Sequence, residues 1–180
     1  MNKLRSKSGM TLTELISGII VLLLVAGILT VGVRLGAKAY VESVSASEAQ
    51  VLCSTLTQCL RDEFRYAETT TQVTEDGVQT VKYFSKNYGG EYTLKADEDG
   101  QLMLYSPAVT TGGSTSAEKK YHLLSSKAYP YGLKANATVE YQDTSDSDGN
   151  QTFVVTLNIT GSSGNTLATT SFEVRKVNPS

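Results

Sequence analysis

The sequence has little of what enzyme active sites use. It contains one histidine, His122, two cysteines and no tryptophan among 180 residues. His122 lies between Tyr121 and Leu123 in a segment that we expect to form a strand, and no Ser-His-Asp or Cys-His arrangement can be built around it. We therefore interpret His122 as a surface or edge residue. No catalytic residue and no cofactor are indicated, and we expect a protein that is not an enzyme.

Proline is also scarce, and none occurs before Pro107. Because proline breaks the interior of a helix, its absence allows one helix to continue from Met10 to about Ala67, a length of roughly 85 Å. Glycines are the weak points of this helix. In its second half apolar residues recur at every fourth position, namely Leu52, Leu56, Leu60 and Phe64. We predict that this half packs on a globular domain from about Val51 onward and that residues 43–49 are exposed.

No charged side chain occurs from Leu15 to Val33. As a helix this run is about 28 Å long, close to the thickness of about 30 Å of the hydrocarbon core of a bilayer. Basic residues flank the run, with Lys3, Arg5 and Lys7 before it and Arg34 after it. The positive-inside rule places the N-terminal side of such a span in the cytoplasm. We expect a single-pass protein of the cytoplasmic membrane whose C-terminal part lies outside.

Two ordinary interpretations of this segment leave Glu14 unexplained. The segment resembles a cleaved secretory signal, because Ala37-Lys38-Ala39 has the A-x-A pattern of signal peptidase sites, but the apolar run is longer than the usual 7–15 residues and Arg34 precedes the site. It also fits a plain uncleaved anchor. A carboxylate at the edge of the apolar phase is costly and usually has a partner and a function. Neither interpretation gives Glu14 such a partner.

The stretch "GMTLTEL", from Gly9 to Leu15, resembles the type III signal of type IV pilins and type II secretion pseudopilins. The resemblance implies that a prepilin peptidase cuts after Gly9, the last residue of a basic leader. Met10 would then be the new, N-methylated N-terminus and Glu14 the fifth mature residue. Met10 departs from the commonest phenylalanine, and Thr13 from the usual isoleucine or valine. The match is sharp over about the first 35 residues and only architectural beyond them.

The same resemblance implies an assembly role for Glu14. Its carboxylate would pair with the Met10 amine of a neighbouring subunit, so that two charges that are costly alone become tolerable together. The implied partners are other pilin or pseudopilin subunits, the prepilin peptidase and an inner-membrane assembly platform. The chain would comprise a leader at 1–9, a membrane and polymerisation segment at 10–33, the rest of the long helix at 34–68 and a head at 69–180.

The head is expected to be rich in β-structure. Period-two patterns predict strands at 78–84, 91–96, 101–106, 134–142, 152–160 and 167–176, with a weaker one near Tyr121. Asp97–Gly100 and Gly161–Asn165 form turns, and Thr110–Glu118 forms a surface loop. The fold class is therefore α+β: a long N-terminal helix packed on a mostly antiparallel sheet, which is also the pilin architecture. This head is larger than that of a minimal major pseudopilin and lacks a disulfide-bounded C-terminal loop, which favours a minor subunit.

Charge and ligand patterns in the head exclude several binding functions. The formal net charge is −2, and loss of the three basic leader residues would make it −5. Without a basic patch, direct nucleic-acid binding is not expected. The acidic stretch Asp143–Asp148 suggests a calcium loop, but aligning Gly149 on the EF-hand glycine puts Thr144 at the first position and Val155 at the twelfth. We predict a solvated turn and no metal site.

The two cysteines, Cys53 and Cys59, both fall in the predicted helix. Six residues along a regular helix separate their Cα atoms by about 9 Å, whereas a disulfide requires less than about 7 Å. We expect two free thiols. The alternative is a local disulfide in a disrupted helix, which an oxidising exterior would favour.

Overall fold

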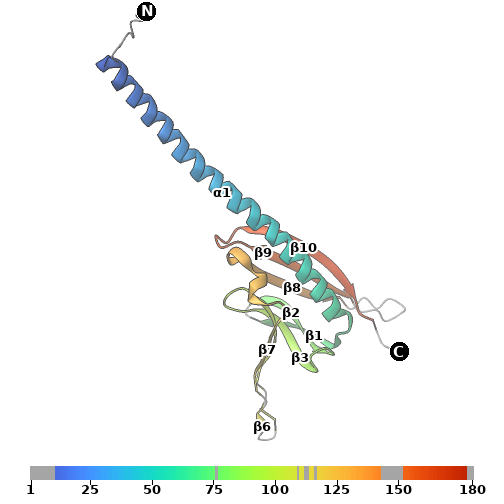
Figure 1. The fold of residues 1–180 in the computed structure, drawn as a ribbon. Coiled ribbons are helices and arrows are strands. Elements are labelled where there is room, and N and C mark those ends of the chain that lie inside the picture. The colour runs from blue at the N-terminus through green and yellow to red at the C-terminus, as the bar shows by residue number, and fades with distance from the viewer. Residues whose placement is uncertain are drawn as a thin grey trace, which may run out of the picture. The chain divides into compact units, whose positions relative to one another are not determined.

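The computed structural model describes residues 11–75, 77–108, 110–111, 114–115, 117–142 and 152–177. It has one long helix, α1 (Leu12–Arg65), followed by antiparallel strands (Figure 1), which confirms the α+β class. The chain divides into two compact units, Met1–Ser43 and Val44–Ser180. The first unit contains the apolar half of α1. The second contains the other half of α1 and the strands that pack against it.

The strands form two main sheets where the sequence predicts one. The larger sheet has the order β1-β2-β3-β4-β7, and the smaller has the order β10-β9-β8. The strands of the larger sheet are β1 (Glu68–Glu75), β2 (Val78–Ser85), β3 (Gly90–Ala96), β4 (Leu102–Ser106) and β7 (Lys119–His122). Those of the smaller sheet are β8 (Lys134–Gln142), β9 (Thr152–Thr160) and β10 (Thr166–Arg175). The short strands β5 (Thr110–Thr111) and β6 (Ser114–Thr115) pair with each other, and two 3-10 turns, η1 (Ser126–Ala128) and η2 (Pro130–Gly132), precede β8.

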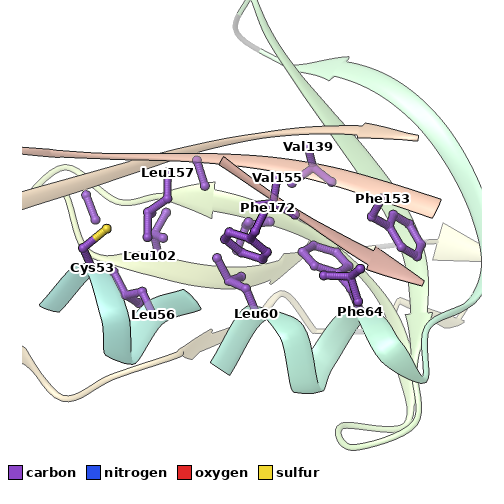
Figure 2. Close-up of a cluster of buried hydrophobic side chains, with 14 of the residues drawn as sticks. Cys53, Leu56, Leu60, Phe64, Leu102, Val139, Phe153, Val155, Leu157 and Phe172 are labelled. Atoms are coloured by element: carbon purple, nitrogen blue, oxygen red, sulfur yellow. The ribbon is translucent and has the colours of Figure 1, made fainter. Parts of the chain in front are cut away.

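The core lies between the second half of α1 and the two sheets (Figure 2). Four helix residues and four residues of β9 belong to this core; they are Leu52, Leu56, Leu60, Phe64, Phe153, Val155, Leu157 and Ile159. The Phe64 ring lies 5.1 Å from the rings of both Tyr83 and Phe153 and so joins the helix to each sheet. Full burial of one such side chain contributes roughly 1.5–3 kcal/mol. The helical stripe and the alternation of β9 are therefore confirmed as core.

The point at which α1 begins to pack is earlier than the sequence predicts. Ala49 is fully buried, and Val44 and Glu48 are half-buried, whereas Val51 is 57% exposed. The expectation that residues 43–49 are exposed is therefore wrong for residues 44–46, 48 and 49, and it holds for Ser43 and Ser47. The reason is helical geometry: Ala49 lies three and four residues before Leu52 and Cys53, on the same face, and Val51 lies off that face. Ala49 therefore extends the buried apolar face of α1 by one turn before Leu52.

The two sheets meet along β8. The N–H of Ala135 donates to the carbonyl of Gly100 over 2.7 Å. Further along, the side-chain amide of Gln72 on β1 takes the place of a strand backbone: its Nε2 donates to the carbonyl of Val139 over 3.1 Å, and its Oε1 accepts from the N–H of Tyr141 over 2.8 Å. These three hydrogen bonds use backbone groups along one edge of β8, but they do not form the continuous backbone ladder that would merge the two sheets. The sequence analysis missed β1 because its polar run shows no alternation.

The predicted turns around β3 and β9 are confirmed. Gly100 has φ +76°, which residues with a side chain rarely adopt, and a Cβ there would lie 2.5 Å from the Lys134 side chain. Asp97 Oδ1 accepts from the N–H of Gln101 over 2.7 Å and closes the β3–β4 hairpin. The N–H of Gly161 donates to the carbonyl of Asn165 in the β9–β10 turn. Asp143–Asp148, the acidic stretch, lies outside the described residues.

Candidate functional site: the N-terminal half of the helix

The apolar segment Leu15–Val33 lies entirely within α1, and it carries no charged side chain along its whole length. The most apolar 18-residue window of α1 has a mean hydropathy of 2.7, and none of it is buried in the fold. Exposure of its large side chains runs from 49% at Val25 to 72% at Ile28. This helix is long and apolar enough to be a single membrane span.

Glu14 and Thr11 form a capping box at the start of α1. The backbone N–H of Thr11 donates to Oε2 of Glu14 over 3.2 Å, and the Thr11 hydroxyl donates to the same oxygen over 3.2 Å. In return, the N–H of Glu14 donates to Oγ1 of Thr11 over 3.3 Å. This reciprocal arrangement satisfies two of the N–H groups that a helix N-terminus leaves unpaired. The sequence analysis missed it, although the T-x-x-E pattern of residues 11–14 is its signature.

The capping box gives Glu14 a partner within its own chain. Both bonds from Thr11 end on Oε2, and no bond to Oε1 is formed within the described residues. A carboxylate has room for several donors, so a second partner can bind at Oε1 without displacing Thr11. The predicted cleavage residues Gly9 and Met10 lie outside the described residues, and their relation to Glu14 stays a prediction.

Four glycines of α1 have no close neighbour within the described residues that would require a residue without a side chain. They are Gly18, Gly27, Gly32 and Gly36, and a Cβ added at any of them would meet nothing within 4 Å. A glycine inside a helix costs up to about 1 kcal/mol relative to alanine. The helix nevertheless continues through all four positions. No contact at these four positions within the described part of the chain offsets that cost.

The two cysteines lie in an unbroken stretch of α1. Cys53 is buried in the core cluster and Cys59 is half-buried, and both are unpaired. Burial raises the pKa of both thiols, and the nearby Asp62 carboxylate raises that of Cys59 further. Because the thiolate is the reactive form, both groups are weak nucleophiles near neutral pH. The oxidation state in the natural compartment stays a prediction.

The head contains a buried acid that the sequence analysis did not single out. Glu63 is 5% exposed and accepts from the hydroxyl of Tyr83 over 3.2 Å and from Nδ2 of Asn87 over 2.8 Å. Burial, and then the Glu63 charge, raise the pKa of Tyr83 well above its ordinary value of 10.0. The three residues tie the end of α1 to the β2–β3 hairpin. The signal was available, since Glu63 follows Leu60 by three residues on the buried stripe.

His122 lies on the edge strand β7, as a surface residue. Its Nδ1 is 3.7 Å from Oδ2 of Asp97, and its side chain is 45% exposed. Beside it, Lys95 and Lys120 each place an ammonium within 6 Å of the Tyr105 ring, at 5.8 and 5.9 Å. Among the described residues no group of three His, Cys, Asp or Glu side chains could hold a metal ion. Nothing in this region forms a nucleophile–base pair.

Comparisons with protein-family models, with curated proteins and with solved structures find no match.

Proposed function

We propose that this chain is a structural, non-enzymatic subunit of the type IV pilin and pseudopilin kind. A prepilin peptidase removes residues 1–9, and the mature chain assembles through its N-terminal helix into a pilus or pseudopilus. The observation that carries this proposal is an acid, Glu14, at the start of a fully exposed and uncharged helical segment. The sequence places that acid five residues after Gly9 and a basic leader.

The exposed apolar surface of Leu15–Val33 fits a helix that moves from the bilayer into a filament. A monomer with this surface is stable in a bilayer, where lipid covers Leu15–Val33. In a filament the corresponding helices of neighbouring subunits would cover the same surface. Contiguous apolar patches of this extent mark membrane or protein contacts rather than solvent-facing surface. The unexplained glycines fit close approach between such helices, because a residue without a side chain allows two backbones to come together.

The geometry of Glu14 is compatible with both a monomer and a filament. In the monomer Thr11 holds Oε2, which fixes the side chain beside the helix start. In the filament Oε1 is available to the Met10 amine of the neighbouring subunit. Cleavage after Gly9 would leave Thr11 and its backbone N–H in place, so the capping box would persist in the mature chain. The cap would then orient the carboxylate for its intermolecular partner.

The remaining parts of the proposal follow from the leader and the head. An inner-membrane platform would extract the processed chain, whose N-terminus faces the cytoplasm and whose head lies outside. The result would be a surface or periplasmic filament for adhesion, motility, DNA uptake or protein secretion. The size of the head favours a minor subunit that begins or tips the filament.

A second candidate is a membrane-anchored or secreted binding domain that does not polymerise. The capping box favours it, because a cap gives Glu14 a use that needs no assembly. The N-terminal residue of the protein made in a host with a prepilin peptidase separates the candidates. The pilin proposal expects N-methylated Met10, a secreted domain expects Tyr40, and a simple anchor expects Met1.

Intact mass supplies the matched control for processing. Gly9→Val should stay full-length, because a peptidase site built for a residue without a side chain has no room for a branched one. Gly18→Val adds the same side chain within the span, where a Cβ meets nothing within 4 Å, and should be cleaved normally. Normal removal of the leader from Gly9→Val would contradict the peptidase assignment.

A further inference from the structure

The edges of the two sheets are protected unequally. Natural proteins guard exposed edges with charge, short length or a covering element, because an unpaired edge is a template for another strand. β7 is four residues long and carries Lys119 and Lys120. β1 and β8 are tied to each other through Gln72. β10 is ten residues long, and its edge opposite β9 pairs with no strand in the described part of the chain.

Over half of its length, the free edge of β10 carries neither charge nor proline. Residues 167–171, Leu-Ala-Thr-Thr-Ser, contain no charge and no proline. The first charge along the strand is Glu173. This segment combines β-branched and small residues, which suit a strand that accepts a neighbour. Only the start of β10, between Thr166 and Ala168, departs from regular pairing with β9.

A groove of about 410 Å³ runs beside this segment. Its walls are Ala168–Thr170 on β10 and, on α1, a row at helical spacing that includes Gln50, Ser54, Gln58 and Arg61. The helix wall is polar but carries only one charge. Neighbouring strands lie about 4.8 Å apart, so a strand added to β10 would occupy this groove. The helix would then lie along one side of the added strand.

Arg61 gives the groove a chemical preference. Its guanidinium lies 5.2 Å from the centre of the Phe172 ring, which holds it beside the strand. Arg61 forms no ion pair with any acid among the described residues. Because the Arg61 guanidinium is the one charge that lines the groove, a ligand with a carboxylate next to Arg61 is favoured.

We propose that the groove between α1 and β10 binds an extended segment of another polypeptide by strand addition. The segment adds to β10 at Ala168–Thr170, where main-chain hydrogen bonds supply the affinity. Its side chains toward α1 are small or uncharged polar ones, and one carboxylate faces Arg61. This inference concerns the head alone and holds whether or not the chain polymerises.

The test uses the full-length chain in detergent micelles and two synthetic probes. Each probe is a capped peptide of eight residues with alternating threonine and valine, and one ends in glutamate where the other ends in glutamine. Amide hydrogen exchange, followed by mass spectrometry, should slow in β10 when either peptide is added and stay unchanged in β7. Arg61→Gln should weaken the glutamate peptide about two- to fivefold, to the affinity of the glutamine peptide.

Two lysine variants control for the site. Thr170→Lys places a charge in the groove and should abolish the protection of β10. Thr156→Lys adds the same charge to the middle strand of the same sheet, on the face opposite the buried Val155, and should bind like the wild type. Both variants should keep slow amide exchange in β9, which shows that the sheet is still folded. If Thr170→Lys speeds exchange in β9, the test of the proposal is the effect of Arg61→Gln on binding of the glutamate peptide. No slowing in β10, or equal slowing in β7, would overturn the proposal, and equal binding of the two peptides would remove the carboxylate from it.

Discussion

Glu14 and Thr11 hold each other at the start of the helix: the Thr11 N–H donates to Oε2 of Glu14 over 3.2 Å, and the Glu14 N–H donates to Oγ1 of Thr11 over 3.3 Å. One carboxylate therefore has two candidate roles, a local cap through Oε2 and an intermolecular pair through Oε1. The two roles respond differently to substitution. Loss of Thr11 removes half of the cap and leaves the charge, whereas Glu14→Gln keeps a residue that can complete the box and removes the charge.

Thr11→Val should loosen the first turn of the helix and little else. Valine has the shape of threonine but cannot accept from the Glu14 N–H, and loss of such a cap costs about 1 kcal/mol. Amide exchange in residues 12–15 should accelerate about fivefold in micelles. Thr11→Ser keeps the hydroxyl and should exchange like the wild type. If capping is the whole purpose of Glu14, Thr11→Val should impair assembly, whereas Glu14→Gln, which can complete the box, should not.

Tyr83→Phe should change how the stability of the head depends on pH. The pKa of Tyr83 is raised above 10.0 by burial and by Glu63, so the folded chain keeps a proton that the unfolded chain loses above about pH 10. This group therefore contributes stability that is fully present below about pH 10 and is lost as pH rises toward the folded pKa. Removing the hydroxyl should flatten that loss.

The same variant should be less stable at neutral pH by about 1–2 kcal/mol, because Glu63 loses one of its two donors. Urea midpoints at pH 7 and pH 10.5 give both quantities. Tyr105→Phe is a suitable control, because the Tyr105 ring contacts the Lys95 and Lys120 ammonium groups and its hydroxyl forms no hydrogen bond within the described residues. A Tyr83→Phe chain that loses as much stability as the wild type between these pH values would contradict this account.

The thiols should be present but slow to react. Burial raises the pKa of Cys53 and Cys59, so less thiolate is available in the folded protein than in a free cysteine. Protein isolated without reductant should give two thiols with a thiol reagent in denaturant and a much slower reaction when folded. Cys59→Ser should lower the count to one. A count of zero, with no intermolecular disulfide on a non-reducing gel, would mean a local bond and a broken helix.

Periodic features were predictable from the sequence, and side-chain bridges were not. The bounds of β8 and β9 follow from alternation, and the four-residue stripe from Leu52 to Phe64 identifies the buried face of α1. β1 was not predicted because Val73 is its single apolar residue, so the strand shows no apolar–polar alternation. Between the two sheets, the side-chain amide of Gln72 and the bond from Ala135 to Gly100 stand where a continuous backbone ladder would otherwise run. No pattern in the sequence reports which side chain will replace a backbone ladder.

The candidate site divides in the same way. The exposed apolar segment and the position of Glu14 are direct properties of the sequence, and the structure adds their exposure. The T-x-x-E spacing of residues 11–14 predicts the cap, whereas an intermolecular partner for Glu14 follows only from the resemblance. The Glu63 network could not be assembled from the sequence, because Asn87 reaches the carboxylate from a turn 24 residues away.

Assembly through Glu14 is the central claim, and the content of sheared filaments tests it most directly. Removing one partner of a poorly solvated ion pair costs about 3–5 kcal/mol, so even the lower value reduces incorporation roughly a hundredfold. The comparison uses chains shown by intact mass to be processed, with Thr11→Val as the cap-only control and Glu14→Asp as the shortened acid. The account predicts that Glu14→Gln is cleaved, stays in the membrane and is missing from filaments, while Thr11→Val is incorporated and Glu14→Asp is intermediate. Filaments containing Glu14→Gln at the wild-type level would contradict it.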